Sequence, residues 1–217
     1  MIHAGEITGL VLAGGRGSRM GGIDKGLQLF RGEPLVWHAV RRLQAQAGDL
    51  MGGLMLNANR NLDRYRRLGL PVWPDPLPDH PGPLAGFLAG LQRCPTAYLL
   101  TTPCDCPLFP LDLARRLASA FEQPDIDMAV AATLGQDGEM HAEPVFCLMR
   151  RSLLQSLESF VRDGGRRVGQ WTGLHRTVLV PFERPGDGPD AFCNANTLDE
   201  LQALENGNAP PLPPLMT

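Results

Sequence analysis

The chain has 217 residues, a formal net charge of -3, 43% hydrophobic residues and 20% charged residues. This composition is typical of a soluble globular protein, and a slightly acidic chain lacks the basic footprint of general nucleic-acid binding. No apolar run is long enough for a membrane helix, the first residues do not resemble a signal peptide, and five scattered cysteines match neither a zinc pattern nor a disulfide framework. We therefore expect a cytoplasmic protein that binds neither nucleic acid nor a membrane.

Short apolar runs predict the strands. Residues 7–13 form such a run, which ends in glycines, and the runs at 50–56 and 97–101 lead into the segments NANR and TPCDCP. A short extended piece is expected at 27–30. Four further strands are expected at 72–73, 128–132, 144–148 and 177–180.

Helices are expected between these strands. Pro34 suits the first turn of a helix whose apolar face begins with Leu35 and Ala39. Thr197 and Glu200, three residues apart, form the pattern of a capping box at the start of the last helix. The remaining expected helices cover 61–68, 84–91, 111–121, 152–161 and 167–171.

Alternating strands and helices predict an α/β fold, a three-layer sandwich with a Rossmann-like, mostly parallel sheet and helices on both faces. The length suits a single domain, which we place at residues 1–205. Residues 206–217 are rich in proline and carry no charge, so we expect a disordered tail, with a proline-motif ligand as the alternative.

The loop that follows the first strand has the composition of a phosphate cradle. Residues 14–22 contain five glycines, and Arg16, Arg19 and Lys25 add positive charge. Glycines let backbone N–H groups approach an anion closely. The spacing fits neither a Walker A loop nor the dinucleotide fingerprint, in which Met20 would have to be glycine. A flexible surface turn is the alternative interpretation.

Two single residues stand out near the same expected edge of the sheet. Lys25 is the one lysine among 20 basic residues, which indicates either a requirement for a compact ammonium or chance. Asp105 follows a buried strand and lies between Pro103 and Pro107. A lone carboxylate at a strand end suits a Mg²⁺ that also binds substrate phosphates, although a turn or capping aspartate has the same appearance.

These segments together resemble the molybdenum cofactor guanylyltransferases, the MobA family within the nucleotidyltransferase superfamily. The pattern LAGG-x(4)-M-G-G-x-D-K at residues 12–25 carries most of the resemblance. Four further matches follow in order: NANR at 57–60, a strand end at PD with Asp75, PGPLAG at 81–86 and PCD at 103–105. Near the C-terminus, FCNANT at 192–197 also resembles the family's pattern. The resemblance covers about residues 7–205, nearly the whole chain.

The resemblance implies transfer of GMP from GTP to the terminal phosphate of molybdopterin, with release of pyrophosphate. It implies a nucleotide-binding N-terminal part, a molybdopterin-binding C-terminal part, and Mg²⁺ on Asp105, with Mn²⁺ as the alternative ion. It further implies a monomer that contacts molybdoenzymes or their chaperones. The implied nucleotide site is Leu12, Ala13, Gly14, Gly15, Lys25, Asn57, Asp75 and Asp105, the catalytic groups are Lys25, Arg19 and Asp105, and the cofactor-substrate site is Arg166, Arg167, Asn194 and Asn196.

Other functions remain open at this point. A molybdopterin cytidylyltransferase would differ in base preference, and a sugar-phosphate nucleotidyltransferase would differ in its acceptor. A non-catalytic protein that binds nucleotide or cofactor and delivers it to a target enzyme is a candidate from a different class. The joint presence of Lys25 and Asp105 favours catalysis, because a delivery protein would not need the carboxylate that holds the metal.

Overall fold

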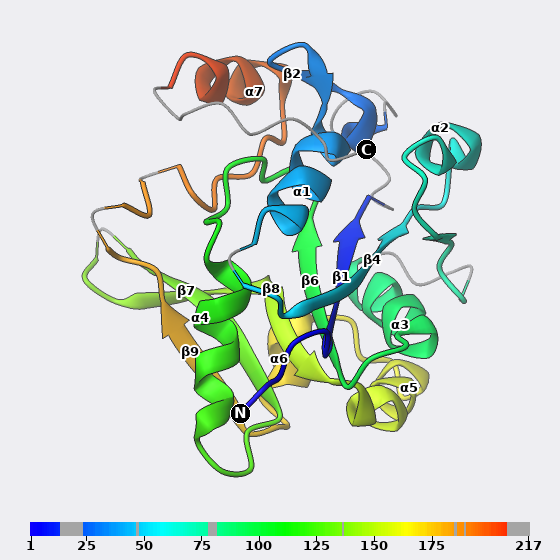
Figure 1. The fold of residues 1–217 in the computed structure, drawn as a ribbon, viewed down its shortest axis with the longest axis vertical. Coiled ribbons are helices and arrows are strands. Elements are labelled where there is room, and N and C mark those ends of the chain that lie inside the picture. The colour runs from blue at the N-terminus through cyan, green and yellow to red at the C-terminus, as the bar shows by residue number, and fades with distance from the viewer. Residues whose placement is uncertain are drawn as a thin grey trace.

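The computed structural model describes residues 1–13, 24–46, 48–77, 82–135, 137–184, 186–188 and 190–207 (Figure 1). Within these residues, seven strands form one sheet in the order β5-β4-β1-β6-β8-β7-β9. Six of these strands run in one direction and β8 runs against them. The strands are β1 (Ile7–Leu12), β4 (Met51–Asn57), β5 (Val72–Trp73), β6 (Tyr98–Pro103), β7 (Met128–Leu134), β8 (Met140–Arg150) and β9 (Thr177–Pro181).

Helices cover both faces of this sheet (Figure 1). Helices α1 (Leu35–Gln44) and α4 (Leu113–Ser119) lie on one face, and α3 (Pro83–Arg93), α5 (Leu154–Arg162) and α6 (Val168–Thr172) lie on the other. The predicted α/β sandwich with a mostly parallel sheet is therefore confirmed. The smaller elements are the hairpin of β2 (Leu29–Phe30) and β3 (Glu33–Pro34), helices α2 (Leu62–Arg66) and α7 (Leu198–Glu205), and the 3-10 turns Lys25–Leu27, Ala120–Glu122 and Arg151–Leu153.

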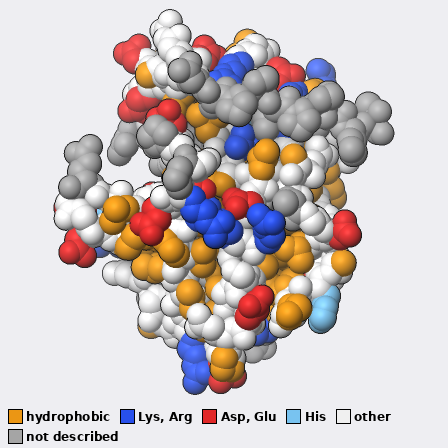
Figure 2. Space-filling view, turned by 60° about the vertical axis from the view of Figure 1, so that its left-hand side comes forward, with side chains coloured by type: hydrophobic (Ala, Val, Ile, Leu, Met, Phe, Trp, Pro, Cys, Tyr) orange, Lys and Arg blue, Asp and Glu red, His pale blue; other side chains and the backbone are white. Residues whose placement is uncertain are grey.

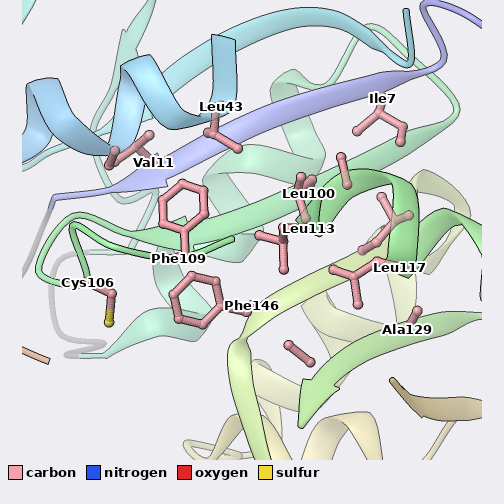
Figure 3. Packing of buried hydrophobic residues seen from close by; sticks show 14 of the residues in the cluster. Ile7, Val11, Leu43, Leu100, Cys106, Phe109, Leu113, Leu117, Ala129 and Phe146 are labelled. Atoms are coloured by element: carbon pink, nitrogen blue, oxygen red, sulfur yellow. The ribbon is translucent and has the colours of Figure 1, made fainter. Parts of the chain in front are cut away.

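The two faces have separate hydrophobic clusters. Successive side chains of a strand point to opposite faces, so Val11 of β1 packs with α1 and α4 while Leu10 packs with α3. Figure 3 shows the first cluster running from Ile7 to Cys106, with the rings of Phe109 and Phe146 near the Cys106 end. The core therefore extends to the edge of the sheet where the parallel strands end.

Three expectations from the sequence need correction. Pro34 is the N-cap residue of α1 and not part of its first turn. The strand expected at 144–148 is the much longer β8, whose first three residues are exposed and so lie outside the apolar run. The tail does not begin at residue 206: Asn206 caps α7, and the carbonyl of Gly207 accepts a hydrogen bond from Arg31. Residues 208–217 lie outside the described part of the chain.

The capping box at the start of the last helix is confirmed. The Thr197 hydroxyl accepts from the backbone N–H of Glu200, and the Glu200 carboxylate accepts from the backbone N–H of Thr197. The same carboxylate also accepts from the backbone N–H of Asn196, at 2.6 Å. The local T-x-x-E sequence therefore fixes the start of α7. It also fixes the backbone of the preceding residues 194–196, which we call the asparagine segment.

Candidate functional site

The carboxyl ends of three neighbouring strands meet at one level of the sheet edge. Leu12 of β1 pairs with Asn57 of β4 on one side and with Pro103 of β6 on the other. The backbone N–H of Ala13 continues this alignment by donating to the carbonyl of Asn57 at 2.8 Å. Ligands of open α/β sheets bind at such strand ends, so the segments that follow these strands form the candidate site.

Three residues from distant parts of the chain converge at this edge. The Lys25 ammonium lies 3.3 Å from Asp105 Oδ2 and donates to Asn196 Oδ1 at 2.8 Å. The side chains of Lys25 and Asp105 are only 18% and 20% exposed, so the pair is sheltered but still open to a ligand. The structure thus brings together one predicted residue from each of the glycine-rich, PCD and FCNANT segments.

Backbone contacts hold these segments against one another. The N–H of Ala195 donates to the carbonyl of Asp105 at 2.8 Å, and the N–H of Cys104 donates to the carbonyl of Leu12 at 3.1 Å. Ala195 is buried, so its small side chain lets the asparagine segment lie close to the end of β6. The positions of Asp105 and Asn196 are therefore linked through the main chain as well as through Lys25.

A second polar cluster lies at the ends of β4 and β5. Asn57 is buried, and its amide donates to Asp75 Oδ1 at 2.8 Å and to the carbonyl of Trp73 at 3.1 Å. Asn59 donates to Asp75 Oδ2 at 2.7 Å and accepts from the backbone N–H of Asp75 at 2.8 Å. Both oxygens of Asp75 thus accept from amides, an arrangement that holds the loop after β5 in place.

Close packing of α3 against the sheet requires a glycine at position 86 of the PGPLAG segment. A side-chain Cβ at this position of α3 would lie 2.5 Å from a methyl group of Leu12 and 2.6 Å from Asn57 Oδ1. Such distances are far inside van der Waals contact, so only glycine lets α3 pack this closely against β1 and β4. The glycine therefore supports the position of Asn57 and has a packing role.

Sequence reasoning missed the role of Asp24, although the residue stood in the quoted G-G-x-D-K pattern. Asp24 is buried and accepts from the hydroxyl of Tyr65 at 2.5 Å and from the amide of Asn61 at 2.9 Å. Gly26 fits beside it, because a Cβ there would lie 2.5 Å from the Tyr65 hydroxyl. Asp24 thus anchors the segment that carries Lys25 to helix α2 and its N-terminal turn.

Cys104 and Cys106, the cysteines that flank Asp105, are both buried. Burial, reinforced by the Asp105 carboxylate, raises the pKa of both the Cys104 and the Cys106 thiols well above the ordinary value. The Cys106 thiol donates to Asn194 Oδ1. The two asparagines of the FCNANT segment therefore face different neighbours, since Asn196 contacts Lys25 and the exposed Asn194 contacts Cys106.

Other predicted site residues are less well defined by contacts. Arg166 and Arg167 are exposed, and Arg166 donates to the carbonyls of Val161 and Gly165. Among the described residues, no hydrogen bond or salt bridge of these two arginines reaches Lys25 or Asp105. Gly14, Gly15, Arg16 and Arg19 lie outside the described residues.

The donor set at this edge fits a hard cation better than zinc. Within the described ranges, no group of three or more His, Cys, Asp or Glu side chains could hold a metal by itself. Asp105 supplies a single, partly exposed carboxylate, and Mg²⁺ binds through one or two protein carboxylates when substrate phosphates and water complete its shell. Figure 2 shows Lys or Arg side chains beside Asp or Glu side chains in a band across one face of the molecule.

No helix in the described part of the chain has the length and apolar character needed to cross a bilayer.

Comparison with protein families and curated proteins gives consistent matches. The family described as the MobA-like NTP transferase domain matches residues 9–178. A molybdenum cofactor guanylyltransferase of an Acidovorax species is 57% identical over 210 residues, which cover 94% of this chain and 98% of that protein. The protein of the same name from Bordetella pertussis is 52% identical over 206 residues, which cover 95% of this chain and 100% of the relative.

Solved structures share the fold at low sequence identity. Molybdopterin-guanine dinucleotide biosynthesis protein A from Archaeoglobus fulgidus has a TM-score of 0.70 at 20% identity, and the match covers 91% of this chain and 96% of that one. The 4-diphosphocytidyl-2C-methyl-D-erythritolsynthase from Anaerococcus prevotii has a TM-score of 0.71 at 10% identity and covers 93% and 97%. At these identities the likeness establishes the fold alone.

Proposed function

The chain belongs to the family of MobA-like NTP transferase domains, and we propose on that premise that it acts as a molybdenum cofactor guanylyltransferase. Its product is then the guanine dinucleotide form of molybdopterin, and its substrates are GTP and the molybdopterin cofactor. The contact of Lys25 with both Asp105 and Asn196 carries the assignment of roles. It places an ammonium, a carboxylate and an amide from three segments at the strand ends.

The transfer needs no general base. The terminal phosphate of molybdopterin is a monoester that carries about -1.5 to -2 charge at neutral pH. One of its oxygens attacks the α-phosphorus of GTP, the bond from the α-phosphorus to the bridging oxygen breaks, and that oxygen leaves with pyrophosphate. The protein therefore has to position two anionic groups and to offset the charge that gathers between them.

The residues at the strand ends suit these tasks. We assign the triphosphate of GTP to the Lys25 ammonium and to the backbone N–H groups of the loop that begins at Gly14, with Gly15 in the same loop. Arg19 would stabilise the charge that develops during attack at the α-phosphorus. Asn196 holds the Lys25 ammonium beside Asp105, so the lysine is already oriented before substrate binds. Leu12 and Ala13 place the start of the loop at the end of β1.

Asp105 is the residue that would hold Mg²⁺, with Mn²⁺ as the alternative ion. When bound, the cation would neutralise phosphate oxygens and so ease the departure of pyrophosphate. Lys25 neutralises the Asp105 carboxylate at 3.3 Å and keeps an anionic pocket from repelling the triphosphate. Asn57 and Asp75 complete the nucleotide side, where their amide–carboxylate contacts set the shape of the loop after β5.

The acceptor side is assigned to the C-terminal part of a single domain at residues 1–205. Asn194 and Asn196, which contact Cys106 and Lys25 respectively, are proposed acceptor contacts next to the nucleotide site. Arg166 and Arg167 are proposed contacts for the molybdopterin phosphate. We further propose that the protein works in the cytoplasm as a monomer and hands its product to molybdoenzymes or their chaperones. None of these steps involves nucleic acid or a membrane.

Pyrophosphate release in the presence of Mg²⁺ and molybdopterin tests the function, with GTP, CTP and ATP assayed in parallel. We expect release with GTP alone. Release with CTP would keep the reaction type and assign a cytidylyltransferase. Binding of GTP without release of pyrophosphate from any nucleotide would contradict the proposal and favour a delivery protein.

A further inference from the structure

A shift in strand register places Glu143 on the sheet face that α1 and α4 cover. The β7–β8 pairing changes between Val130, which pairs with Cys147, and Ala131, which pairs with Glu143. Simple alternation along β8 would put Glu143 on the same side as Cys147, which packs against the α3 face. The shift instead places it opposite Ala131, whose side chain belongs to the cluster of α1 and α4.

The segment that carries Asn194 and Asn196 begins on the same face of the sheet. Phe192, which precedes that segment, packs in the same cluster as Ala131 and Cys106. Burial comes first among the causes that raise the pKa of the Cys106 and Cys193 thiols, and the charge of Glu143 contributes to both. Glu143 therefore lies within electrostatic range of Cys106, whose thiol contacts Asn194.

The Glu143 carboxylate is half-buried and accepts few hydrogen bonds. The Thr133 hydroxyl donates to its Oε1 at 3.3 Å, and among the described residues no salt bridge reaches it. Burial raises the pKa of this carboxyl above its ordinary value, and the hydrogen bond from Thr133 and the nearby His141 partly offset that rise. A carboxylate accepts through two oxygens, so Glu143 retains acceptor capacity that a ligand with paired N–H donors would fill.

The order of the strands separates this carboxylate from the nucleotide loops. Asn57 and Asp75 lie at the ends of β4 and β5, on one side of β1, while β8 and β7 lie beyond β6 on the other side. Asp105, which follows β6, lies between the two groups, and Lys25 contacts it there. If the molybdopterin phosphate binds at Lys25, the rest of the acceptor can extend to the side of the sheet that carries Asn194 and Glu143.

We propose that Glu143 is a specificity-determining residue that accepts hydrogen bonds from the aminopyrimidinone edge of the acceptor's pterin ring. This edge presents an amino group and an adjacent ring N–H, which match the two oxygens of a carboxylate. Guanine presents the same edge, but the sheet order places Glu143 on the side away from Asn57 and Asp75. The inference rests on the proposed guanylyltransferase function, since that function supplies the pterin.

The test compares Glu143→Gln with Glu139→Gln, a control on an exposed residue of the same hairpin. Glutamine keeps the shape and still accepts from Thr133, but it replaces one acceptor by a donor. We expect the KM for molybdopterin to rise about 10-fold or more, as for loss of a hydrogen bond to a charged group. The KM for GTP should stay unchanged, and Glu139→Gln should behave like the unmodified protein in both.

Two other results would overturn the inference. An unchanged KM for molybdopterin would show that Glu143 does not contact the acceptor, and a raised KM for GTP would show that it contacts guanine. A fluorescence titration separates this question from the proposed function, because it needs no turnover. The unmodified protein should bind pterin more tightly than lumazine, in which a carbonyl replaces the amino group, and Glu143→Gln should lose that preference.

A protein that binds pterin selectively but releases no pyrophosphate would contradict the guanylyltransferase function while leaving the role of Glu143 intact. Equal binding of pterin and lumazine by the unmodified protein would overturn the role of Glu143, whatever the turnover.

Discussion

Two carboxylates at the same edge of the sheet have opposite surroundings. Asp105, at the end of β6, lies 3.3 Å from the Lys25 ammonium, which Asn196 holds in place. Glu143, near the start of β8, has a single hydroxyl donor, from Thr133, and burial raises the pKa of its carboxyl. One charge is balanced within the protein and the other is not.

The difference matches the proposed ligand of each carboxylate. The triphosphate of GTP brings several negative charges, so a carboxylate in its path must be neutralised before the nucleotide can bind. A neutral ring with N–H donors, in contrast, requires an acceptor that the protein has left free. The comparison therefore predicts that changes at Asp105 and Lys25 affect the reaction itself, while a change at Glu143 affects recognition of the acceptor.

Asp105→Asn should have the largest effect. It removes the charge that would hold the cation, and loss of such an electrostatic group lowers kcat about 100-fold or more. Asparagine can still accept from Lys25, so the fold should persist. Pyrophosphate release measures the effect, and Asp63→Asn, on a side chain that is 92% exposed on α2, is the matched control. Turnover within a few-fold of the unmodified rate would contradict the assigned role of Asp105.

Lys25→Met should lower kcat/KM nearly as much, because it removes the ammonium that faces the triphosphate. Lys25→Arg keeps the charge, but its planar fork does not reproduce a compact point charge held between Asp105 and Asn196. We expect the arginine variant to remain at least about 10-fold below the unmodified protein. Full activity in Lys25→Arg would mean that the single lysine among 20 basic residues has no functional cause.

Gly26→Ala tests the anchor of the lysine segment through stability. Its Cβ would lie 2.5 Å from the Tyr65 hydroxyl, which donates to the buried Asp24. Displacing that hydroxyl should lower the free energy of unfolding by about 2 kcal/mol, which corresponds to a fall in Tm of about 4–8 °C for a chain of this size. Gly53→Ala, where a Cβ would meet nothing within 4 Å, should leave Tm nearly unchanged. Equal Tm values for the two variants would contradict the anchor.

Local sequence patterns were sufficient for much of the fold. The apolar run of β1 and the capping box of Thr197 and Glu200 depend on neighbouring residues alone, and both agree with the structure. The length of β8 could not be predicted in this way. Residues Met140 to Ala142 are exposed, and they belong to the strand because their backbone pairs with β7. The register shift that orients Glu143 is likewise a property of two strands and not of either one.

The candidate site shows the same limit. Lys25, Asp105 and Asn196 each followed from a motif, yet their mutual contact spans up to 171 residues of sequence. Asp24 stood beside Lys25 in the motif, but its partner Tyr65 comes from α2, and no spacing rule connects the two. Motifs therefore identified the residues that act on charged substrates, whereas the residues that hold them in place became visible only in the folded chain.

The smallest expected effect concerns the stability of Glu143→Gln. The folded-state pKa of Glu143 lies above that of the unfolded chain because burial disfavours its charged form. The native state therefore binds an extra proton between these two pKa values, and its stability falls as the pH rises through them. The penalty is complete above the folded-state pKa, so Glu143→Gln should have the higher Tm at neutral pH.

Glu143→Gln is thus expected to stabilise the protein although it weakens binding of the acceptor. The Tm advantage of Glu143→Gln should vanish as the pH falls toward about 4, where the unfolded carboxyl also becomes protonated, while Glu139→Gln should show no such trend. Thermal unfolding at a series of pH values measures both. A variant that gains stability but binds the acceptor less tightly would show that the carboxylate is kept for its ligand, because its burial destabilises the free protein. A Tm advantage that persisted or grew at acidic pH would instead mean that ionisation of Glu143 is not its origin.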